Sequence, residues 1–523
     1  MIGVRFYPVK AKPVRKVTAE AMLELPDFAP LRVAHNRASR RTFDSLDHLL
    51  IVSTQDAGPR VLRKFPQGRQ LGTLLARARE RGDEFASSRV SNARATGVTV
   101  AAYSRGSAFS TLSWARRVLA ECTRDKPATL GIAFVDALSD TDASAARSAL
   151  VSAAAAVAFN LPTFKTADAP QSLRTLRLIE QKADAALDPV LAQALGNNVA
   201  RWLTTLPPNV LTAAAYRSVL ERLAAKHGLR HRFLNEDRLR KLGAGAFLAV
   251  SQGNSHRDAG IAHLSYRPRR RKHAALALVG KGVLFDTGGT NLKTFKDMVD
   301  MHIDMQGSAV AFGTLLALAT LEVPFGVDAW LAISENTIGP TSYKPQDIVH
   351  AANGTTIQVI HTDAEGRMVL ADTLALASRE KPDLIVDYAT LTGTCITALT
   401  ERYSGVFTNR AAANRDLAHV GAQSGERVWP FPMDDDFDEM LKSDVADVKQ
   451  CSVETQGDHI VAARFLQRFV PQEIPWVHVD LSAGQHKGGL AHVPSEITGF
   501  GVGFTLELLR GTTPAEIAKR WAA

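Results

Sequence analysis

Three charged side chains fall at alternate positions in the stretch HTDAEGRMVLAD, residues 361–372: Asp363, Glu365 and Arg367. The apolar residues that follow recur at helical spacing, which predicts a helix that belongs in the core. A capping box from Thr362 to Glu365 would explain one acid at the start of such a helix. It does not explain Asp363, or the glycine between Glu365 and Arg367. The stretch therefore suggests a chemical role beside the structural one.

Further charged residues follow other predicted strands. Lys281, Asp286 and Lys293 lie in VGKGVLFDTGGTNLK, and Asp304 lies in MHIDMQGSA ahead of an apolar helical stretch. In an open parallel sheet, ligands collect outside the carboxyl ends of the strands, so one cleft could gather all of these side chains. The spacing G-K-G around Lys281 is not that of a phosphate-binding loop.

Four carboxylates in one cleft would repel each other unless a cation lay between them. Several bridging carboxylates suit two divalent ions about 3.5–4 Å apart. Oxygen donors with one amine, and without thiolate or imidazole, favour Mn²⁺ or Zn²⁺, with Mg²⁺ as a third alternative. The residues therefore predict a dinuclear metal site.

Each candidate also has a structural interpretation when it is taken alone. Lys281 and Lys293 are compatible with solvated surface lysines, and Asp286 with the cap of a glycine turn. His361 fits a strand-end histidine with a hydrogen-bond partner better than a metal ligand. Asp304 is harder to explain in this way, because an unpaired acid in an apolar stretch is costly.

Apolar strands and helices alternate from about residue 210 onward. A mostly parallel sheet covered by helices on both faces is expected from this pattern. The helix-like stretches include 308–321, and the predicted strands are 274–280, 326–334, 355–360, 383–389 and 476–482.

The chain divides into three predicted parts. Residues 1–165 mix apolar runs with alanine-rich helical stretches and predict a smaller N-terminal α/β domain. Residues 166–206 are expected to form a helical connector. Residues 207–523 are expected to form a larger C-terminal domain that holds the predicted metal site. The fold class is thus α/β with two domains.

Composition excludes several classes of protein. The 523 residues are 46% hydrophobic and 22% charged, which describes a globular chain and not a disordered one. Runs of about 18 apolar residues are absent, so no membrane span is expected. The three cysteines lie far apart, which favours a reducing, cytoplasmic location.

The net charge of +9 is unevenly distributed. Residues 1–170 hold 25 Lys plus Arg against 15 Asp plus Glu, a balance of +10, so the remainder totals −1. Nucleic-acid binding is one interpretation of this basic third. An ordinary solvated surface is the other, and the absence of interleaved aromatic residues favours it.

Four blocks resemble those of the leucyl aminopeptidases, a family of dinuclear metallopeptidases. The blocks are VGKGVLFDTGGTNLK (279–293), DMVDMHIDMQGSA (297–309), HTDAEGRMVLADTL (361–374) and ATLTG (389–393). The similarity extends from residue 207 to residue 504. The first 165 residues carry no comparable motif.

The resemblance implies a role for each matching residue. The metal ligands would be Lys281, Asp286, Asp304, Asp363 and Glu365. The catalytic residues would be Lys293 and Arg367. Substrate would contact Lys293, Asp304, Met301, Thr390 and Leu391.

The resemblance also implies an activity and an assembly. Two divalent ions per subunit would activate a bridging water, and a bicarbonate near Arg367 would relay its proton. The enzyme would release N-terminal, leucine-like residues from short peptides and would form a homohexamer. His361, Gln306 and the pair Thr290–Asn291 depart from the family pattern and border the expected cleft, so the side-chain preference stays open.

Overall fold

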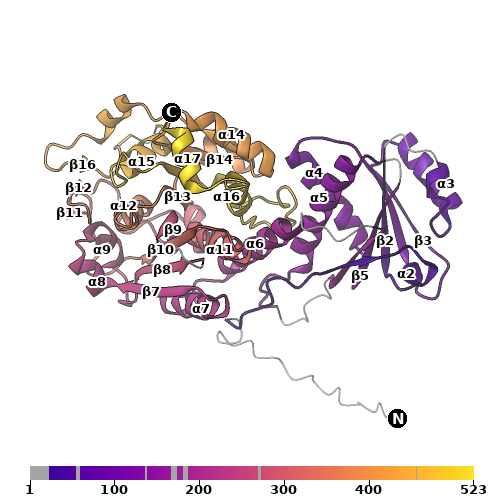
Figure 1. The fold of residues 1–523 in the computed structure, drawn as a ribbon. Helices are drawn as coiled ribbons and strands as arrows, with labels where there is room; N and C mark the ends of the chain where they lie inside the picture. Colours follow the sequence, from indigo (N-terminus) through magenta and orange to yellow (C-terminus); the bar gives the residue numbers. More distant parts are fainter. Residues whose placement is uncertain are drawn as a thin grey trace, which may run out of the picture.

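The computed structural model describes residues 23–54, 59–135, 138–165, 173–180, 187–268, 273–454 and 456–522. Two lobes, each built on its own sheet, lie side by side (Figure 1). The sheet of the N-terminal lobe has the order β1-β6-β5-β2-β4-β3. Its strands are β1 (Arg32–Asn36), β2 (His48–Thr54), β3 (Phe85–Arg89), β4 (Gly97–Tyr103), β5 (Thr129–Phe134) and β6 (Thr175–Ile179). All neighbours in this sheet pair in parallel except β3 and β4.

Helices cover this N-terminal sheet. The longest are α3 (Gly68–Glu80), α4 (Ala108–Cys122) and α5 (Asp140–Ala158); α2 (Arg40–Asp44) and the 3₁₀ turn η1 (Pro59–Leu62) are short. Alanines along α5 let it pack closely, and most of its residues from Ala146 onward are buried. The expected α/β class of this lobe is confirmed.

The prediction that 166–206 is a helical connector is wrong in one part. Strand β6 lies inside that range and pairs with both β1 and β5. Its sequence, TLRLI, alternates partly exposed with buried residues, the period of a strand. Helix α6 (Asp188–Thr205) occupies the second half of the range, and residues 166–172 and 181–186 lie outside the described residues.

The C-terminal lobe has an eight-stranded sheet of order β15-β14-β17-β13-β9-β10-β8-β7. Its strands are β7 (Arg230–Asn235), β8 (Gly260–Tyr266), β9 (Ala274–Asp286), β10 (Gly326–Asn336), β13 (Leu384–Ala389), β14 (Ser404–Thr408), β15 (Val428–Pro430) and β17 (Trp476–Asp480). The central strands β17, β13, β9 and β10 pair in parallel, and β8 and β7 extend one edge antiparallel. The expected mostly parallel sheet is confirmed.

Both faces of the central strands are buried. Along β9, Leu276 and Leu278 belong to one hydrophobic cluster, while Ala277 and Val279 belong to the other. The first cluster packs α6, α7 (Ala213–Lys226), α11 (Gln306–Thr320), α14 (Ala413–Ser424), α16 (Val502–Leu508) and α17 (Pro514–Trp521) on the sheet. The second packs α8 (Glu236–Lys241), α9 (Gly245–Ser251), α12 (Glu365–Ser378) and α15 (Asp458–Gln467).

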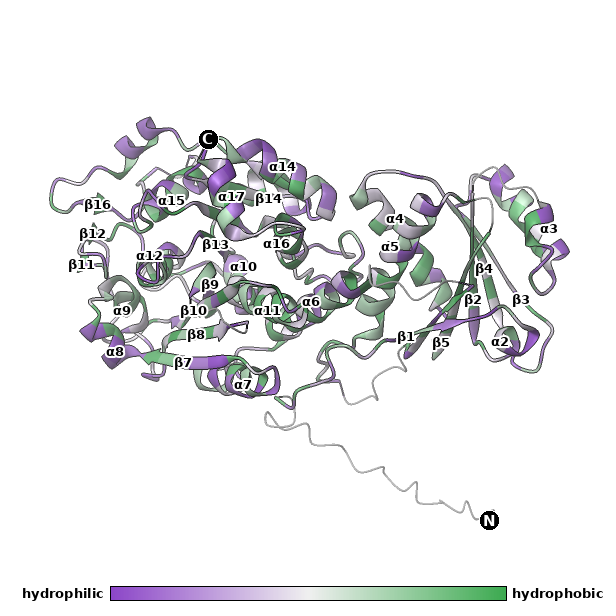
Figure 2. Cartoon of the chain, in the orientation of Figure 1, coloured by the Kyte–Doolittle hydropathy of each residue, from purple (hydrophilic) through white to green (hydrophobic). Residues whose placement is uncertain are grey.

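One helical segment in the described part of the chain, Phe295–Thr320, is long and apolar enough to cross a membrane by composition alone. It comprises α10 (Phe295–Met298), η3 (Met301–Ile303) and α11. Figure 2 shows α11 as a mostly hydrophobic helix inside the C-terminal lobe. Its most apolar window is 83% buried within the fold, so α11 has the burial of a core helix.

The predicted strand 355–360 does not belong to the main sheet. Only β12 (Thr356–Gln358) forms, and it pairs with β11 (Ile348–His350) and β16 (Val448–Lys449) in a separate small sheet. Asp363 and Glu365 therefore do not follow a strand of the main sheet. They are brought to its edge by a loop and by the start of α12.

Asp372 ties three segments together inside the C-terminal lobe. Its carboxylate, fully buried on α12, accepts hydrogen bonds from Phe247 N at 2.8 Å and from Ala352 N at 2.7 Å. Asp372→Ala would leave both buried donors without a partner, which costs about 1–3 kcal/mol each. We expect the free energy of unfolding to fall by about 3 kcal/mol in denaturant titrations, whereas the exposed control Asp436→Ala should change it by less than about 0.5 kcal/mol.

Burial also raises the pKa of Asp372 to about 7, above the value expected in the unfolded chain. The stability that Asp372 contributes is therefore fully present at low pH and decreases as the pH rises through 7. The difference in stability between the wild type and Asp372→Ala should be smaller at pH 8 than at pH 5. An equal or larger difference at pH 8 would contradict the account of this residue.

Candidate metal centre

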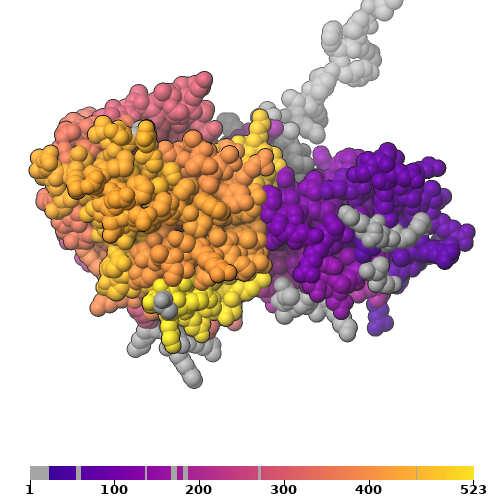
Figure 3. Space-filling model, turned by 90° about the horizontal axis from the view of Figure 1, so that it is seen from above, coloured from indigo at the N-terminus to yellow at the C-terminus, as the bar shows by residue number. Residues whose placement is uncertain are grey.

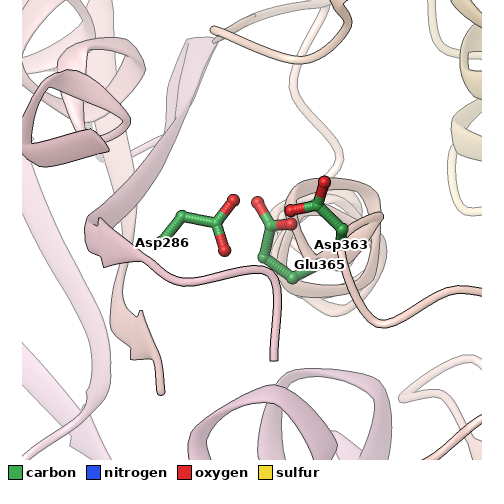
Figure 4. A group of neighbouring side chains, drawn as sticks. All are labelled: Asp286, Asp363 and Glu365. Carbon is green, nitrogen blue, oxygen red and sulfur yellow. The ribbon is translucent and has the colours of Figure 1, made fainter. Parts of the chain in front are cut away.

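Three carboxylates from separate elements converge beside the carboxyl end of β9. Asp286 is the last residue of β9, Asp363 lies in the loop before α12, and Glu365 is the first residue of α12. One oxygen atom from each carboxylate lies within 4.8 Å of the other two, and Figure 4 shows the three side chains pointing toward a common point. Such a cluster could hold a divalent cation.

Two lysines and a fourth acid complete the cluster. Lys281 Nζ lies 2.7 Å from Asp304 Oδ1 and 2.8 Å from Glu365 Oε1. Lys293 Nζ lies 2.9 Å from Asp286 Oδ2 and 2.5 Å from Asp363 Oδ1. The structure thus brings together the five predicted metal ligands and Lys293. Four carboxylates against two ammonium groups leave an excess of two negative charges.

The lysines are protonated in this arrangement. Burial lowers the pKa of Lys281, but the charges of Asp304, Glu365 and Asp286 outweigh burial and raise it above its usual value. The pKa of Lys293 is raised in the same way, against its burial, by neighbouring carboxylates. Both ammonium groups therefore act as counter-ions here.

The pKa values of two of the acids are also raised, which disfavours their charged forms. Burial, with the charges of Glu365 and Asp286, raises the pKa of Asp363 to about 7. Burial also raises the pKa of Asp304 well above its ordinary value, and its Oδ2 atom is buried without a hydrogen-bond partner among the described residues. The two lysines therefore do not fully neutralise the cluster.

Two glycine features permit this packing. Gly288 and Gly289 have φ of 85° and 66°, the left-handed region that favours glycine, and they turn the chain after β9 so that Lys293 faces Asp286. Gly366 lies inside α12, where a Cβ atom would come within 2.7 Å of Lys281 Nζ. The absence of a side chain at Gly366 therefore permits the close approach of Lys281.

Thr362 does not cap α12. The N-cap residue is Ala364, and no side chain caps the helix. Instead, Thr362 Oγ1 donates to Gly288 O at 2.7 Å and accepts from Asn291 N at 2.8 Å. The expected capping box is therefore wrong, because Thr362 joins the loop before α12 to the loop after β9.

Sequence reasoning missed several residues that position the acids. Asn336 Nδ2, at the end of β10, donates to Asp286 Oδ1 at 2.8 Å and to Thr362 O at 3.1 Å. Tyr343 donates its hydroxyl to Thr362 O at 2.7 Å. Asn336 and Tyr343 are far from the acids in the sequence, so local patterns do not connect them. The position of Asn336 at the end of a parallel strand is the one signal that could have indicated it.

The residues that depart from the family pattern mostly have structural partners. Asn291 Oδ1 accepts from Thr362 N, and His361 Nδ1 accepts from Asp363 N. Gln306 is fully buried and donates to Gly484 O at 2.9 Å. Thr290 Oγ1 donates to Tyr343 O at 3.2 Å. These positions therefore fix the walls of the site.

The predicted substrate-binding residues surround the same cluster. Thr390 O accepts from Lys281 Nζ at 3.1 Å, and Thr390 Oγ1 donates to Asp304 Oδ1 at 2.8 Å. Leu391 N donates to Asp480 Oδ1 at 3.1 Å. Met301 is partly buried at the start of η3, three residues before Asp304.

Arg367 is the third residue of α12 and is buried there. Its Nη2 atom lies 2.7 Å from Asp458 Oδ2, at the start of α15, and its Nη1 atom lies 3.4 Å from Gln450 O. Burial lowers the pKa of Arg367, but the charge of Asp458 outweighs burial and raises it. Arg367 is therefore a fixed cation that already has a carboxylate partner from the chain.

Comparisons with known proteins agree with this geometry. Residues 198–506 match the sequence model of the catalytic domain of the cytosol aminopeptidase family. A probable cytosol aminopeptidase of Syntrophotalea carbinolica is 39% identical over 354 residues, which cover 66% of this chain and 71% of that protein. One of Parasynechococcus marenigrum is 40% identical over 337 residues, or 64% of this chain and 68% of its own length.

Solved structures extend the similarity to both lobes. A variant of tomato leucine aminopeptidase superposes with a TM-score of 0.80 at 26% identity, over 92% of this chain and 97% of that one. The bottromycin maturation enzyme BotP in complex with Mn superposes with a TM-score of 0.76 at 28% identity, over 90% of this chain and 99% of that one.

Proposed function

Because the chain belongs to the cytosol aminopeptidase family and is a metal-dependent exopeptidase, we propose that its acidic cluster holds two divalent ions for peptide hydrolysis. The ligands would be Lys281, Asp286, Asp304, Asp363 and Glu365. The observation that carries the proposal is the convergence of four carboxylates and two lysines at one point. The substrates would be short peptides with a leucine-like first residue.

The residues fit such ions. Carboxylate oxygens are donors that Mn²⁺, Zn²⁺ and Mg²⁺ all accept, and the cluster keeps two unneutralised negative charges and an unpartnered buried Asp304 oxygen. When bound, two ions in such a site acidify water and polarise a carbonyl. Lys281 would have to lose its proton to become a ligand, so metal binding should release protons.

Lys293 would stabilise charge during the reaction, and neighbouring residues would position the groups of the site. The Lys293 ammonium, once released from Asp286 and Asp363, would stabilise the oxyanion that forms on the scissile carbonyl. Asp480 holds Leu391 N and Thr392 Oγ1, which fixes the loop that carries the Leu391 carbonyl beside the substrate amine. Asn336 keeps Asp286 in place.

Arg367, the residue that would hold a bicarbonate, already has an anionic partner from the chain. Its Nη2 atom carries the Asp458 carboxylate at 2.7 Å, which would repel a second negative charge on the same edge, and its buried Nε atom has no hydrogen-bond partner among the described residues. We therefore propose that Asp458 orients Arg367 without an added anion.

Asp458→Ala tests this arrangement. In the wild type, added bicarbonate should leave kcat unchanged. The variant would leave the buried Arg367 cation unpaired, so we expect kcat to fall about 10-fold or more and to recover partly with bicarbonate. Binding of ¹³C-labelled bicarbonate should appear only in the variant, and the exposed control Asp444→Ala should match the wild type. A wild type that binds or requires bicarbonate would refute the role of Asp458.

The proposed activity is tested with a panel of aminoacyl amides. The protein is stripped with a chelator, and hydrolysis is followed after adding back Mn²⁺, Zn²⁺ or Mg²⁺. We expect hydrolysis only after metal addition, with leucyl amide among the fastest substrates. Hydrolysis by the stripped protein, or of N-blocked substrates at the same rate, would exclude a metal-dependent aminopeptidase.

Nucleic-acid binding by the basic N-terminal third is a weaker candidate. Several of its arginines are paired with acids, among them Arg81 with Asp83, Arg94 with Asp47 and Arg117 with Glu84. These pairs reduce the positive charge available to phosphates. A mobility-shift series at rising salt tests the candidate, because phosphate-dominated binding must weaken steeply.

We also propose a cytoplasmic location, in keeping with the names of the curated relatives, and a homohexameric assembly, which the family resemblance implies. The mass in solution tests the assembly. Six chains of 56.5 kDa are expected, and a monomer would exclude it.

A further inference from the structure

A cavity of about 660 Å³ lies where the two lobes meet, away from the metal centre. Figure 3 shows the N-terminal lobe in contact with the C-terminal lobe along this junction. The end of α5 and the following loop form one wall, α4 another, and α6 with residues 494 and 495 the rest. Three of the lining residues, Arg116, Lys165 and Arg201, are cationic, and none is acidic. The uncharged polar members are Thr123, Asn160, Thr163 and Ser495.

Arg201 is a buried cation that has no acidic partner in the described segments of the chain. It is 1% exposed, and its Nε atom donates to Ser495 Oγ at 3.0 Å. Its Nη1 atom donates to Asn198 Oδ1 and to Ala156 O. All three acceptors are neutral, and its Nη2 atom has no partner in the described ranges. Burying a guanidinium without an anion is costly, so an anion at this place would be stabilising.

Arg116, on the α4 side of the cavity, likewise has only neutral hydrogen-bond partners among the described residues. Its Nε atom donates to Ala491 O at 3.0 Å and its Nη1 atom to Gly488 O, which leaves Nη2 without a partner within the part of the chain that the structure describes. The next arginine, Arg117, forms a two-bonded ion pair with Glu84. Arg117 thus has an acidic partner, whereas the hydrogen-bond partners that the described segments offer Arg116, which faces the cavity, are backbone carbonyls only.

His492 shows that the surroundings are electropositive. It is buried, and its Nδ1 atom has no hydrogen-bond partner among described residues. Burial, together with the charges of Arg201 and Arg116, lowers the pKa of His492 to about 4. The histidine therefore stays neutral near pH 7, and the described residues that line the cavity include no acid to offset the arginines.

We propose that this cavity binds a small phosphate-type oxyanion, free or as the phosphate of a small ester, between the two lobes. Guanidinium groups present paired donors that match phosphate oxygens, and Lys165 adds a third charge at the rim. The volume falls within the range of small-molecule sites. Because the anion would touch α4, α6 and the loop at Ser495, its binding should stabilise the packing of the lobes.

The test uses the full-length, metal-loaded protein. Its thermal unfolding and calorimetric binding are measured with inorganic phosphate, with glycerol phosphate and with sulfate, at ionic strength held constant with chloride. We expect saturable stabilisation with one site per chain. A larger effect of glycerol phosphate than of inorganic phosphate would identify an ester as the ligand, and equal effects would identify the free anion.

Variants separate this site from the metal centre, which could itself bind phosphate. Lys165→Gln and the double variant Arg116→Gln with Lys165→Gln should raise Kd roughly tenfold or more. The control, Arg81→Gln with Arg124→Gln, removes two exposed charges of the same lobe and should keep the wild-type Kd. Lys165 is exposed, so we expect its single variant to fold normally. The single variant therefore controls for misfolding of the double variant. The proposal is overturned by an absence of saturable binding, or by an unchanged Kd in Lys165→Gln and the double variant.

Discussion

Lys293→Ala is expected to lower kcat about 100-fold or more while changing KM little, on the scale of a lost oxyanion donor. The reason is the position of Nζ, within 3 Å of oxygens of both Asp286 and Asp363, whereas the neighbouring Lys281 would be occupied as a metal ligand. Steady-state hydrolysis of leucyl amide with saturating metal measures the effect.

Lys296→Ala is the matched control. Lys296 is exposed on α10, three residues further along the chain, and its loss should leave kcat unchanged. If Lys293→Ala also retained a near-wild-type kcat, Lys293 would be only a counter-ion of the acidic cluster.

Glu365→Gln is expected to have the largest effect of any single replacement. Glu365 is buried, belongs to the three-acid cluster and lies 2.8 Å from Lys281 Nζ, so removing its charge changes both halves of the proposed site. Residues that only hydrogen-bond to a metal ligand contribute about 10–100-fold to metal affinity, so a ligand itself should contribute at least as much. We expect metal Kd to rise about 100-fold or more and kcat to fall roughly 10³-fold.

The control is Glu380→Gln, an exposed glutamate just beyond the other end of α12. It should bind metal and hydrolyse substrate like the wild type. Wild-type metal affinity in Glu365→Gln would show that the acids do not act as ligands.

The parts of the site that sequence could predict are those that follow long, apolar elements. Asp286 ends β9, a strand of 13 residues, and Glu365 begins α12, a helix of 14 residues, so their positions follow from the rule on strand ends and from helical periodicity. The parallel sheet itself follows from the apolar runs of β9, β10 and β13. These are local signals that the tertiary structure preserves.

What the sequence could not show depends on contacts between distant segments. Thr362 resembles a helix cap in the sequence. Its hydroxyl instead hydrogen-bonds to Gly288 O and Asn291 N, which lie more than 70 residues away. Asp458 lies 91 residues from Arg367, and nothing in its local sequence marks it as the partner of a buried cation. The run 355–360 is apolar enough for a strand, but only three of its residues pair, and in a separate sheet.

The most direct test of the account is an equilibrium titration of chelator-stripped protein with Mn²⁺ while leucyl amide hydrolysis is followed in the same samples. We predict two ions per chain, release of protons as Lys281 gives up its ammonium form, and activity that rises with occupancy. Full activity in the stripped protein, or fewer than two ions bound at saturation, would contradict a dinuclear centre built from these residues.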